Sequence, residues 1–161
     1  MNYSYCRYQS EDFAALYAVE ELCFDAPFRF SRTLMRKLVA NPNSATWIAE
    51  DSAGEKKTMA GFTIVEWTAL PKGLVAYIQT IEVHPESRRR GIASELLKRA
   101  EDSARAAGAA AIWLHVDVEN AAAIQLYESR GYARRGREEH FYARQRPAFV
   151  YAKPLPHDRL D

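Results

Sequence analysis

The sequence predicts a mixed α/β fold of the α+β kind, with a twisted, mostly antiparallel sheet and helices on both of its faces. Three strand-like segments, 45–50, 58–68 and 75–84, are joined by short turns, as in an antiparallel meander. Residues 75–118 read as strand, helix and strand, which predicts one parallel pair joined by a crossover helix. The chain has 161 residues, of which 48% are hydrophobic, so we expect a single domain spanning 1–161.

The N-terminal part of the chain supplies one strand and two helices. Aromatic and smaller residues alternate over 3–8, which favours a strand. Apolar residues then recur at helical spacing over 11–24, and Ser10 is expected to cap this helix. Ser31 is expected to cap a second helix over 31–40. Two helices therefore precede the meander.

The helix predicted over 91–107 has the clearest amphipathic pattern in the chain. Gly108 follows it as a C-terminal stop, and the next strand is predicted over 111–118. The residues that share the apolar face of this helix are Ile92, Leu96, Leu97, Ala100 and Ala104. An amphipathic helix between two apolar strands is what a crossover connection requires.

The C-terminal elements complete the predicted sheet. Asn120 is expected to cap a short helix over 121–130, and Gly131 is expected to end it. Two further strands are predicted over 132–143, which is rich in arginine, and over 148–155.

Charge and cysteine content narrow the classes of protein to consider. The formal net charge is +1, which argues against a general nucleic-acid or membrane binder. No apolar run approaches the ~20 residues of a membrane span, and the N-terminus lacks the apolar core of a signal peptide. Cys6 and Cys23 fit neither a disulfide framework nor a metal site. Reduced thiols, no metal and a cytoplasmic location are therefore expected.

Residues 88–93, Arg-Arg-Arg-Gly-Ile-Ala, lie between the strand at 75–84 and the body of the next helix. The first turn of a helix has unpaired N–H donors, Gly91 leaves space for a ligand, and the arginines add positive charge. This combination favours a phosphate-bearing ligand. The spacing matches neither a P-loop nor a dinucleotide-binding glycine motif. The alternative is a solvated run of charges before an ordinary helix.

Two segments then resemble one known family. Arg88, Gly91 and Ala93 match the signature Q/R-x-x-G-x-G/A, and residues 120–132, NAAAIQLYESRGY, match N-x-x-A-x-x-L-Y-x-x-x-G-F/Y. Both are motifs of the GNAT superfamily of acetyl-CoA-dependent N-acetyltransferases, and the chain most resembles the RimI type, which acetylates the N-terminal alanine of a ribosomal protein. The resemblance implies an acyl-CoA N-acyltransferase fold in which the fourth and fifth strands splay apart, with acetyl-CoA as co-substrate.

The resemblance also implies a set of acetyl-CoA contacts. The backbone of Ile81, Glu82 and Val83 would meet the pantetheine arm, and Asn120 would touch the cofactor where the strands separate. The amides of 89–94 would hold the pyrophosphate. The cofactor-binding residues expected in this segment are Arg88, Arg89, Arg90, Gly91, Ile92, Ala93 and Ser94.

The catalytic roles follow from the same resemblance. Tyr127 would protonate the departing CoA thiolate and also contact the cofactor; the alternative is a packing aromatic. His115 stands in a W-L-H-V context where RimI-type enzymes carry a glutamate, and it is the first candidate for the general base. It is otherwise a hydrogen-bonded structural residue. Glu82 is the second candidate for the general base, and it would otherwise be an exposed residue of its strand. Water is the third candidate.

The acceptor site is expected between two loops. Residues 20–31 resemble the substrate loop of the family, with Phe30 in place of a tryptophan, and 140–155 align with its last loop and strand. The RimI-type enzymes have an acidic pair in this last loop, and Arg146 and Pro147 replace it here. This replacement argues against the ribosomal substrate. The candidate substrate-binding residues are Phe28, Phe30, Phe141 and Tyr142. The alternative for these aromatics is closure of the core.

The function expected from the sequence is direct acetyl transfer to a primary amine in a ternary complex. A protein N-terminal amine is the preferred acceptor. The alternatives are a small amine, such as a polyamine, amino acid or aminoglycoside, and a catalytically silent acyl-CoA sensor. The arginines and aromatics of 130–146 resemble an RNA-binding surface, but interspersed glutamates make nucleic acid an improbable partner. We expect no membrane partner, and a monomer or homodimer.

Overall fold

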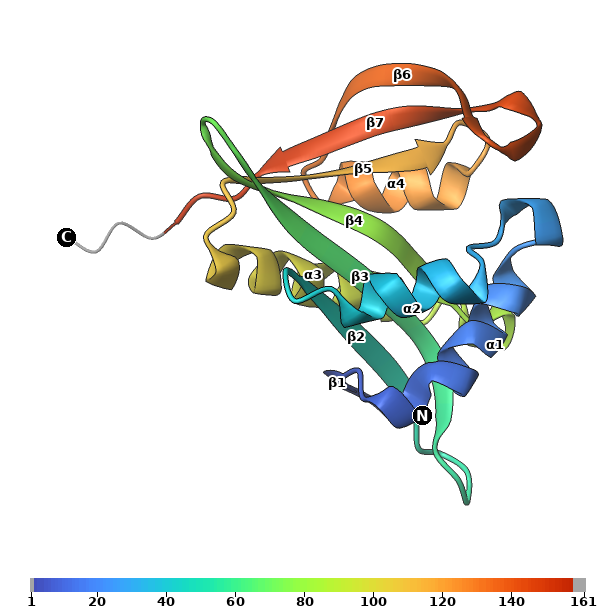
Figure 1. Ribbon diagram of the computed structural model, residues 1–161. Coiled ribbons are helices and arrows are strands. Elements are labelled where there is room, and N and C mark those ends of the chain that lie inside the picture. The colour runs from blue at the N-terminus through green and yellow to red at the C-terminus, as the bar shows by residue number, and fades with distance from the viewer. Residues whose placement is uncertain (1, 158–161) are drawn as a thin grey trace.

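The computed structural model describes residues 2–157 and consists of one seven-stranded sheet with helices on both faces (Figure 1). The strands are β1 (Tyr3–Arg7), β2 (Ser44–Asp51), β3 (Thr58–Leu70), β4 (Gly73–Val83), β5 (Ala111–Asp117), β6 (Ala133–Tyr142) and β7 (Arg146–Pro154). The helices are α1 (Phe13–Cys23), α2 (Arg32–Ala40), α3 (Ile92–Ala107) and α4 (Ala121–Ser129). Short 3-10 turns occur at η1 (Ser10–Asp12), η2 (Ala26–Phe28), η3 (Pro85–Ser87) and η4 (Ala143–Gln145).

The order of the strands confirms the predicted mixed sheet. It runs β1-β2-β3-β4-β5-β7-β6, and every neighbouring pair is antiparallel except β4 and β5. The parallel pair is joined through α3, as a crossover connection requires. The predicted separation of these two strands is also present. Their ladder begins at Val75 and Ala111 and ends at Ile78 and Leu114, although β4 continues to Val83.

An irregularity in β4 lies where the two strands begin to separate. Val65 of β3 pairs with Ile78, whereas the preceding residue, Ile64, pairs with Thr80. Gln79 is therefore an extra residue, a β-bulge, and the alternation of faces shifts across it. Ile78 belongs to the core on the α3 face, while Thr80 and Glu82 share the opposite face with Ile64. The bulge thus determines which side chains of β4 point to each side of the fork.

Two cores cover the two faces of the sheet. One core lies beneath α1 and α2 and is built around Leu16, Met35, Phe62 and Ile64. The other lies beneath α3 and α4, where side chains such as Leu97 pack against β3, β4 and β5. Figure 1 shows α1 and α2 in front of the sheet and α3 behind it. Amphipathic helices on opposite faces explain why the central strands are almost continuously apolar.

The predicted helix caps are confirmed at two positions and wrong at one. Ser31 Oγ accepts the N–H of Leu34 at 3.1 Å, and Asn120 Oδ1 accepts the N–H of Ala123 at 3.1 Å. Ser10 does not cap the first helix but begins the turn η1, and α1 starts later than predicted. At η1 the carboxylate of Asp12 accepts the N–H of Gln9 at 2.8 Å. Gln9 and Asp12 together form a capping box.

Most strand boundaries agree with the prediction within a few residues, but β7 begins two residues early, at Arg146. The observed strand includes Pro147, which cannot donate to a ladder. The partner strand β6 has an irregular register between Glu138 and Tyr142, opposite this position. The bulge accepts the proline at the start of the strand.

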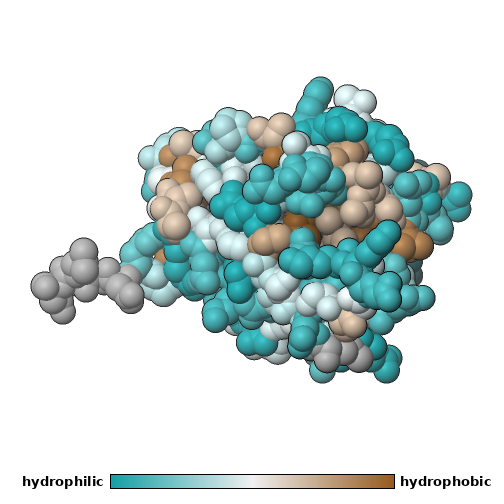
Figure 2. Space-filling view, turned by 90° about the horizontal axis from the view of Figure 1, so that it is seen from below, coloured by the Kyte–Doolittle hydropathy of each residue, from teal (hydrophilic) through white to brown (hydrophobic). Residues whose placement is uncertain are grey.

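The surface is mostly hydrophilic on the face seen in Figure 2, with apolar residues in small groups between polar ones. The large hydrophobic side chains that remain exposed are Leu22, Phe24, Leu34, Leu70 and Phe141. Within residues 2–157, no helix combines the length and the apolar character that crossing a bilayer would take.

Candidate active site

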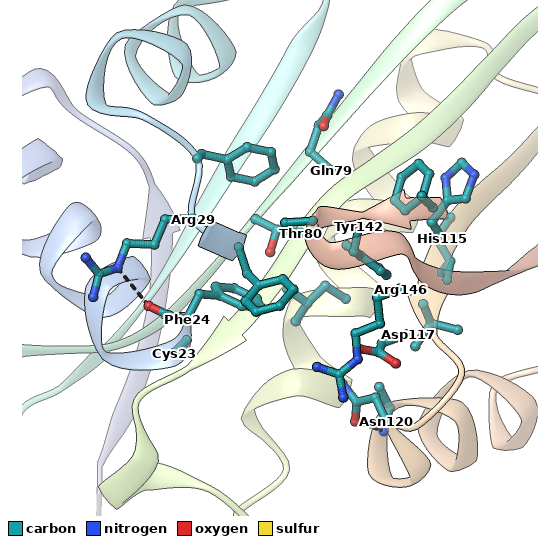
Figure 3. Close-up of a pocket in the computed structure, with 18 of the residues that line it drawn as sticks. Cys23, Phe24, Arg29, Gln79, Thr80, His115, Asp117, Asn120, Tyr142 and Arg146 are labelled. Atoms are coloured by element: carbon teal, nitrogen blue, oxygen red, sulfur yellow. Dashed lines mark hydrogen bonds and ion pairs between the residues drawn. The ribbon is translucent and has the colours of Figure 1, made fainter. Parts of the chain in front are cut away.

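A cleft of about 720 Å³ opens where β4 and β5 diverge (Figure 3). Its walls come from β4, β5, the connection between α1 and α2, helix α4, and the turn between β6 and β7. In Figure 3, Phe24 lies across this space from Tyr142 and Arg146, while the Arg29 side chain turns away from it and donates to the carbonyl of Phe24. Elements far apart in the sequence thus meet at the fork of the sheet, which is where the sequence predicted the site.

Alternation along β5 places two kinds of side chain on opposite sides of the fork. Leu114 and Val116 join the core beneath α3, together with Tyr127 of α4. His115 points the other way and contacts Tyr77 of β4. A ligand between the two strands would have Tyr127 on one side and the Tyr77–His115 pair on the other.

His115 is held from three sides. Its Nδ1 lies 2.8 Å from Tyr77 Oη, and its Nε2 lies 2.6 Å from a carboxylate oxygen of Glu138. The ring stacks on Phe141, with centroids 3.8 Å apart and an interplanar angle of 11°. The His115 side chain is only 8% exposed, although the residue lines the cleft. His115 is therefore both hydrogen-bonded and adjacent to the space where an acceptor would lie.

Tyr77 is a site residue that the sequence analysis missed. It lies in an apolar strand where an aromatic residue signals only β-propensity. Its parallel partner in the ladder is Trp113, two residues before His115, so the strand register was the signal that could have found it. Burial, followed by the charges of Tyr142, Glu66 and Glu138, raises the pKa of the Tyr77 phenol. Tyr77 therefore stays protonated at neutral pH and can donate a hydrogen bond.

Tyr127 lies where the sequence predicted, at the fork. It lines the cleft, is 7% exposed and packs against the ring of Tyr132 with centroids 5.7 Å apart. Burial raises the pKa of its phenol. The side chain is therefore a neutral phenol that packs against an aromatic neighbour, and its role as the acid stays a prediction.

Glu82 is buried, at 3% exposure, so its alternative reading as an exposed strand residue is wrong. Thr80 Oγ1 donates to it at 2.8 Å. Burial, followed by the adjacent Glu20, raises its pKa well above the ordinary value. Glu20 is fully buried, accepts the N–H of Phe30 at 2.9 Å, and was not recognised from the sequence. The raised pKa favours the protonated, neutral form of Glu82 beside the Glu20 carboxyl.

Glu20 rather than Glu82 faces the cleft, because only Glu20 is among the lining residues. The buried oxygens Oε2 of Glu20 and Oε1 of Glu82 find no donor from other side chains in residues 2–157. A protonated Glu82 would supply a donor within this pair. The pair thus joins α1 to β4 beneath the connection that forms one wall of the cleft.

The predicted phosphate-binding segment has the backbone of a concave turn. Gly91 is the N-cap of α3 with φ of 79°, and Arg89 has φ of 63°. A Cβ built on Gly91 would meet no atom within 4 Å, so the glycine is needed for its left-handed backbone and not to avoid a protein contact. The space above it is open, as the prediction required.

The side chains of this segment mostly contact the protein itself. Arg88 Nε donates to the carbonyl of Val83 at 3.3 Å, and Arg90 Nη1 donates to Tyr3 Oη at 2.8 Å. Ile92 is buried in the core, and Ser94 bonds to Arg130. Arg88 and Arg90 thus bond to neutral groups and keep their positive charge, and the phosphate contact of the backbone amides stays a prediction. The cleft itself reaches Ile81 of β4 and does not include residues 88–94.

Five other predicted residues lie on the cleft, whereas Val83 of β4 does not line it. Asn120 lines it while capping α4, so its side-chain amide nitrogen is left to donate. The four predicted acceptor-site aromatics, Phe28, Phe30, Phe141 and Tyr142, also line it. Burial, followed by the nearby Asp117, raises the pKa of Tyr142 to about 12.

Arg146 closes one edge of the cleft (Figure 3). Its Nε lies 2.9 Å from a carboxylate oxygen of Asp117, and it also pairs with Glu119. Its guanidinium lies 5.8 Å from the ring centroid of Phe28, on the connection between α1 and α2. The basic residue that replaces an acidic one here is thus paired, and it links the two loops expected to hold the acceptor.

Comparison with known proteins gives one family match. The model of the acetyltransferase (GNAT) family matches residues 13–132. Streptothricin acetyltransferase of Streptomyces lavendulae is 37% identical over 100 residues, which cover 62% of this chain and 50% of that protein. The ribosomal protein bS18 alanine N-acetyltransferase of Escherichia coli K12 is 42% identical over 57 residues, which cover 35% of this chain and 38% of that protein. The chain thus matches half or less of the length of these curated relatives.

The fold is also similar to solved structures. The crystal structure of the NatC complex bound to Gag peptide and CoA contains a chain that superposes with a TM-score of 0.87 and 26% sequence identity. The match covers 97% of this chain and all of the other. Peptide and CoA are thus bound in the complex that contains this similar chain.

Proposed function

Because the chain belongs to the acetyltransferase (GNAT) family, we propose that it transfers the acetyl group of acetyl-CoA directly to a primary amine. The proposal covers 1–161 as one N-acetyltransferase domain. The observation that carries it is the fork of the sheet, which has a neutral phenol, Tyr127, on one side and a hydrogen-bonded histidine, His115, on the other. Acetyl-CoA supplies the acetyl group as a thioester.

The residues present fit acetyl-CoA at two places. Beyond Ile78 the backbone of β4 has no strand partner on the β5 side, so the backbone at Ile81 faces the cleft and can bond the pantetheine arm. The carbonyl of Val83 is less suited, because Arg88 and Cys23 already donate to it. At the start of α3, the amides of residues 89–94 have the open space and helix polarity that a pyrophosphate needs.

His115 is our candidate for the general base. It lines the cleft and contacts Tyr77, whereas Glu82 lies outside the lining residues, and its raised pKa favours a protonated form that cannot act as a base. His115 would accept the proton of the attacking amine through the Tyr77 hydroxyl or through water. Tyr127 would donate the proton that the leaving thiolate requires.

A peptide N-terminus is the acceptor that we propose first. Two loops that meet through Arg146 and Phe28 form an aromatic-lined wall, which suits an extended chain end entering the fork. The bS18 alanine N-acetyltransferase and the peptide-bound NatC chain support this choice. A small amine is the second candidate, because the streptothricin enzyme matches over a longer stretch. A silent acyl-CoA sensor is the third.

The proposed enzyme works in the cytoplasm, as a monomer or homodimer. Both of its cysteines are free thiols, which suits a reducing compartment. No metal takes part in the proposed chemistry.

A CoA-release screen tests the proposal. Purified protein and acetyl-CoA are mixed with lysine-free peptides that begin with Ala, Ser or Met, with the same peptides acetylated at the N-terminus, and with spermidine, lysine and streptothricin. Release of CoA with free peptides but not with blocked ones supports a peptide acceptor. Release with small amines alone moves the assignment to the second candidate.

The remaining outcomes distinguish a silent acyl-CoA sensor from a chain that does not bind acetyl-CoA. If acetyl-CoA raises the Tm and no acceptor releases CoA, the sensor is favoured. If a folded sample binds neither CoA nor acetyl-CoA, the family's activity does not apply to this chain.

A further inference from the structure

Glu138 of β6 is a charged residue outside the set predicted from the sequence, and it contacts the candidate base. Its carboxylate lies 2.6 Å from His115 Nε2. The Glu138 side chain is 55% exposed, whereas that of His115 is 8% exposed. Phe141 covers one face of the imidazole, and Trp113 and Tyr77 flank it. Glu138 is therefore the polar contact of His115 that reaches solvent.

The carboxylate fixes the tautomer of the neutral ring. An ionised carboxylate can only accept, so Nε2 must carry a hydrogen where it meets Glu138. Nδ1 of the neutral imidazole is then an acceptor, and the Tyr77 hydroxyl, 2.8 Å away, donates to it. The Tyr77 oxygen keeps its lone pairs for a group in the cleft, which Tyr77 also lines.

From this geometry we infer that Glu138, His115 and Tyr77 form a proton path from the acceptor amine to solvent, with Glu138 as its positioning residue. The inference rests on the proposed acetyl transfer. The ammonium gives a proton to Tyr77 Oη, the phenolic proton passes to Nδ1, and the proton on Nε2 leaves through Glu138 to water. Tyr77 and the imidazole each gain one proton and lose one, and the amine is left uncharged for attack. The ring ends with its hydrogen on Nδ1 and returns to the Nε2 tautomer by proton exchange with water before the next turnover.

Few other ionisable groups act on this path within residues 2–157. Glu66 of β3 and Tyr142 of β6 face Tyr77, and the Glu66 carboxylate accepts from Gln79 Nε2 at 2.8 Å. Asp117, on the same strand as His115, is occupied by Arg146. Glu138 is thus the carboxylate with a direct contact to the imidazole.

The first test needs no substrate. Nitrogen-15 NMR of labelled protein, at a pH where the His115 ring is neutral, should show its proton on Nε2. A downfield proton signal bonded to that nitrogen should be absent in E138A and in H115A. The control E139A should keep it, because the neighbouring Glu139 pairs with Arg137 and not with His115. A neutral ring protonated on Nδ1 would overturn the inference.

The second test measures turnover with acetyl-CoA and a peptide with a free N-terminal alanine. E138A should lower kcat about 10-fold or more, with unchanged KM for acetyl-CoA, as loss of an orienting carboxylate does elsewhere. E139A should behave as the wild type. Equal kcat in E138A and wild type would refute the path. If the wild type shows no turnover, the proposed function fails, and NMR still decides the role of Glu138.

Discussion

Gly91, at the start of α3, offers the sharpest test of where acetyl-CoA binds, because α3 ends in a glycine of the same kind. Gly91 has φ of 79° and Gly108 has φ of 95°, and at each position a Cβ would meet no atom within 4 Å. An alanine at either site is therefore strained only by its left-handed backbone, which costs about 1–2 kcal/mol. For a chain of this size we expect Tm to fall by about 2–8 °C in both G91A and G108A.

The affinity for CoA should distinguish substitutions at the two ends of α3. In G91D a carboxylate would stand near the proposed pyrophosphate, and two unit charges 4 Å apart repel by about 1 kcal/mol in water and about 4 kcal/mol at a protein surface. The Kd for CoA should thus rise by between about 5-fold and about 1000-fold. G108D should lose stability to a similar extent but bind CoA as the wild type does.

Isothermal titration calorimetry with CoA, together with thermal denaturation, measures both quantities on the same samples. The reasoning is refuted if G91D and G108D bind CoA with the same Kd while both are folded. It is also refuted if the G91A change destabilises far more than G108A, because the open space at both sites would then have been misjudged.

Three further substitutions test the chemistry and the buried carboxylates. Y127F should lower kcat with little change in the Kd for CoA. The control Y132F removes a buried hydroxyl without a partner in residues 2–157 and should retain turnover. Equal kcat in the two variants would remove Tyr127 from the mechanism. H115A should lower kcat and flatten the acidic limb of the pH–rate profile, and an unchanged profile would leave water as the base. E82Q should stabilise the fold relative to the wild type by an amount that increases with pH. Burial raises the pKa of Glu82 in the folded protein. The stabilising contribution of Glu82 is therefore complete below its ordinary pKa of 4.5 and is lost as pH rises through the folded pKa. Urea denaturation across pH measures this, and a pH-independent difference between E82Q and wild type would contradict it.

Local signals predicted the elements of this fold well. The apolar face of α3, the caps Ser31 and Asn120, and the strand–helix–strand order are all readable from short stretches of sequence. Ser10 was misassigned because Asp12 offers a competing cap to Gln9, and both patterns occur within four residues. Local rules cannot rank two such caps when each is worth about 1 kcal/mol.

The partners of the site residues could not be predicted in the same way. His115 was identified from its position in a motif, but Tyr77 and Glu138 reach it from strands 38 and 23 residues away. Their meeting depends on the register of β4 against β5 and on the irregular pairing of β6 with β7. Glu20 was unreadable for the same reason, since a lone acidic residue on a helix is normally solvated.

The extra residue in β4 has a consequence for protein engineering. Because Gln79 is accommodated by a bulge, deleting it would make Ile78 and Thr80 neighbours in a regular ladder opposite Val65 and Ile64. Thr80 and Glu82 would keep their face, but β4 would lose the local bend and added twist at the point where it leaves β5. Chimaeras built with related acetyltransferases should therefore preserve the number of residues between Tyr77 and Glu82, even where the sequences on either side are freely exchanged.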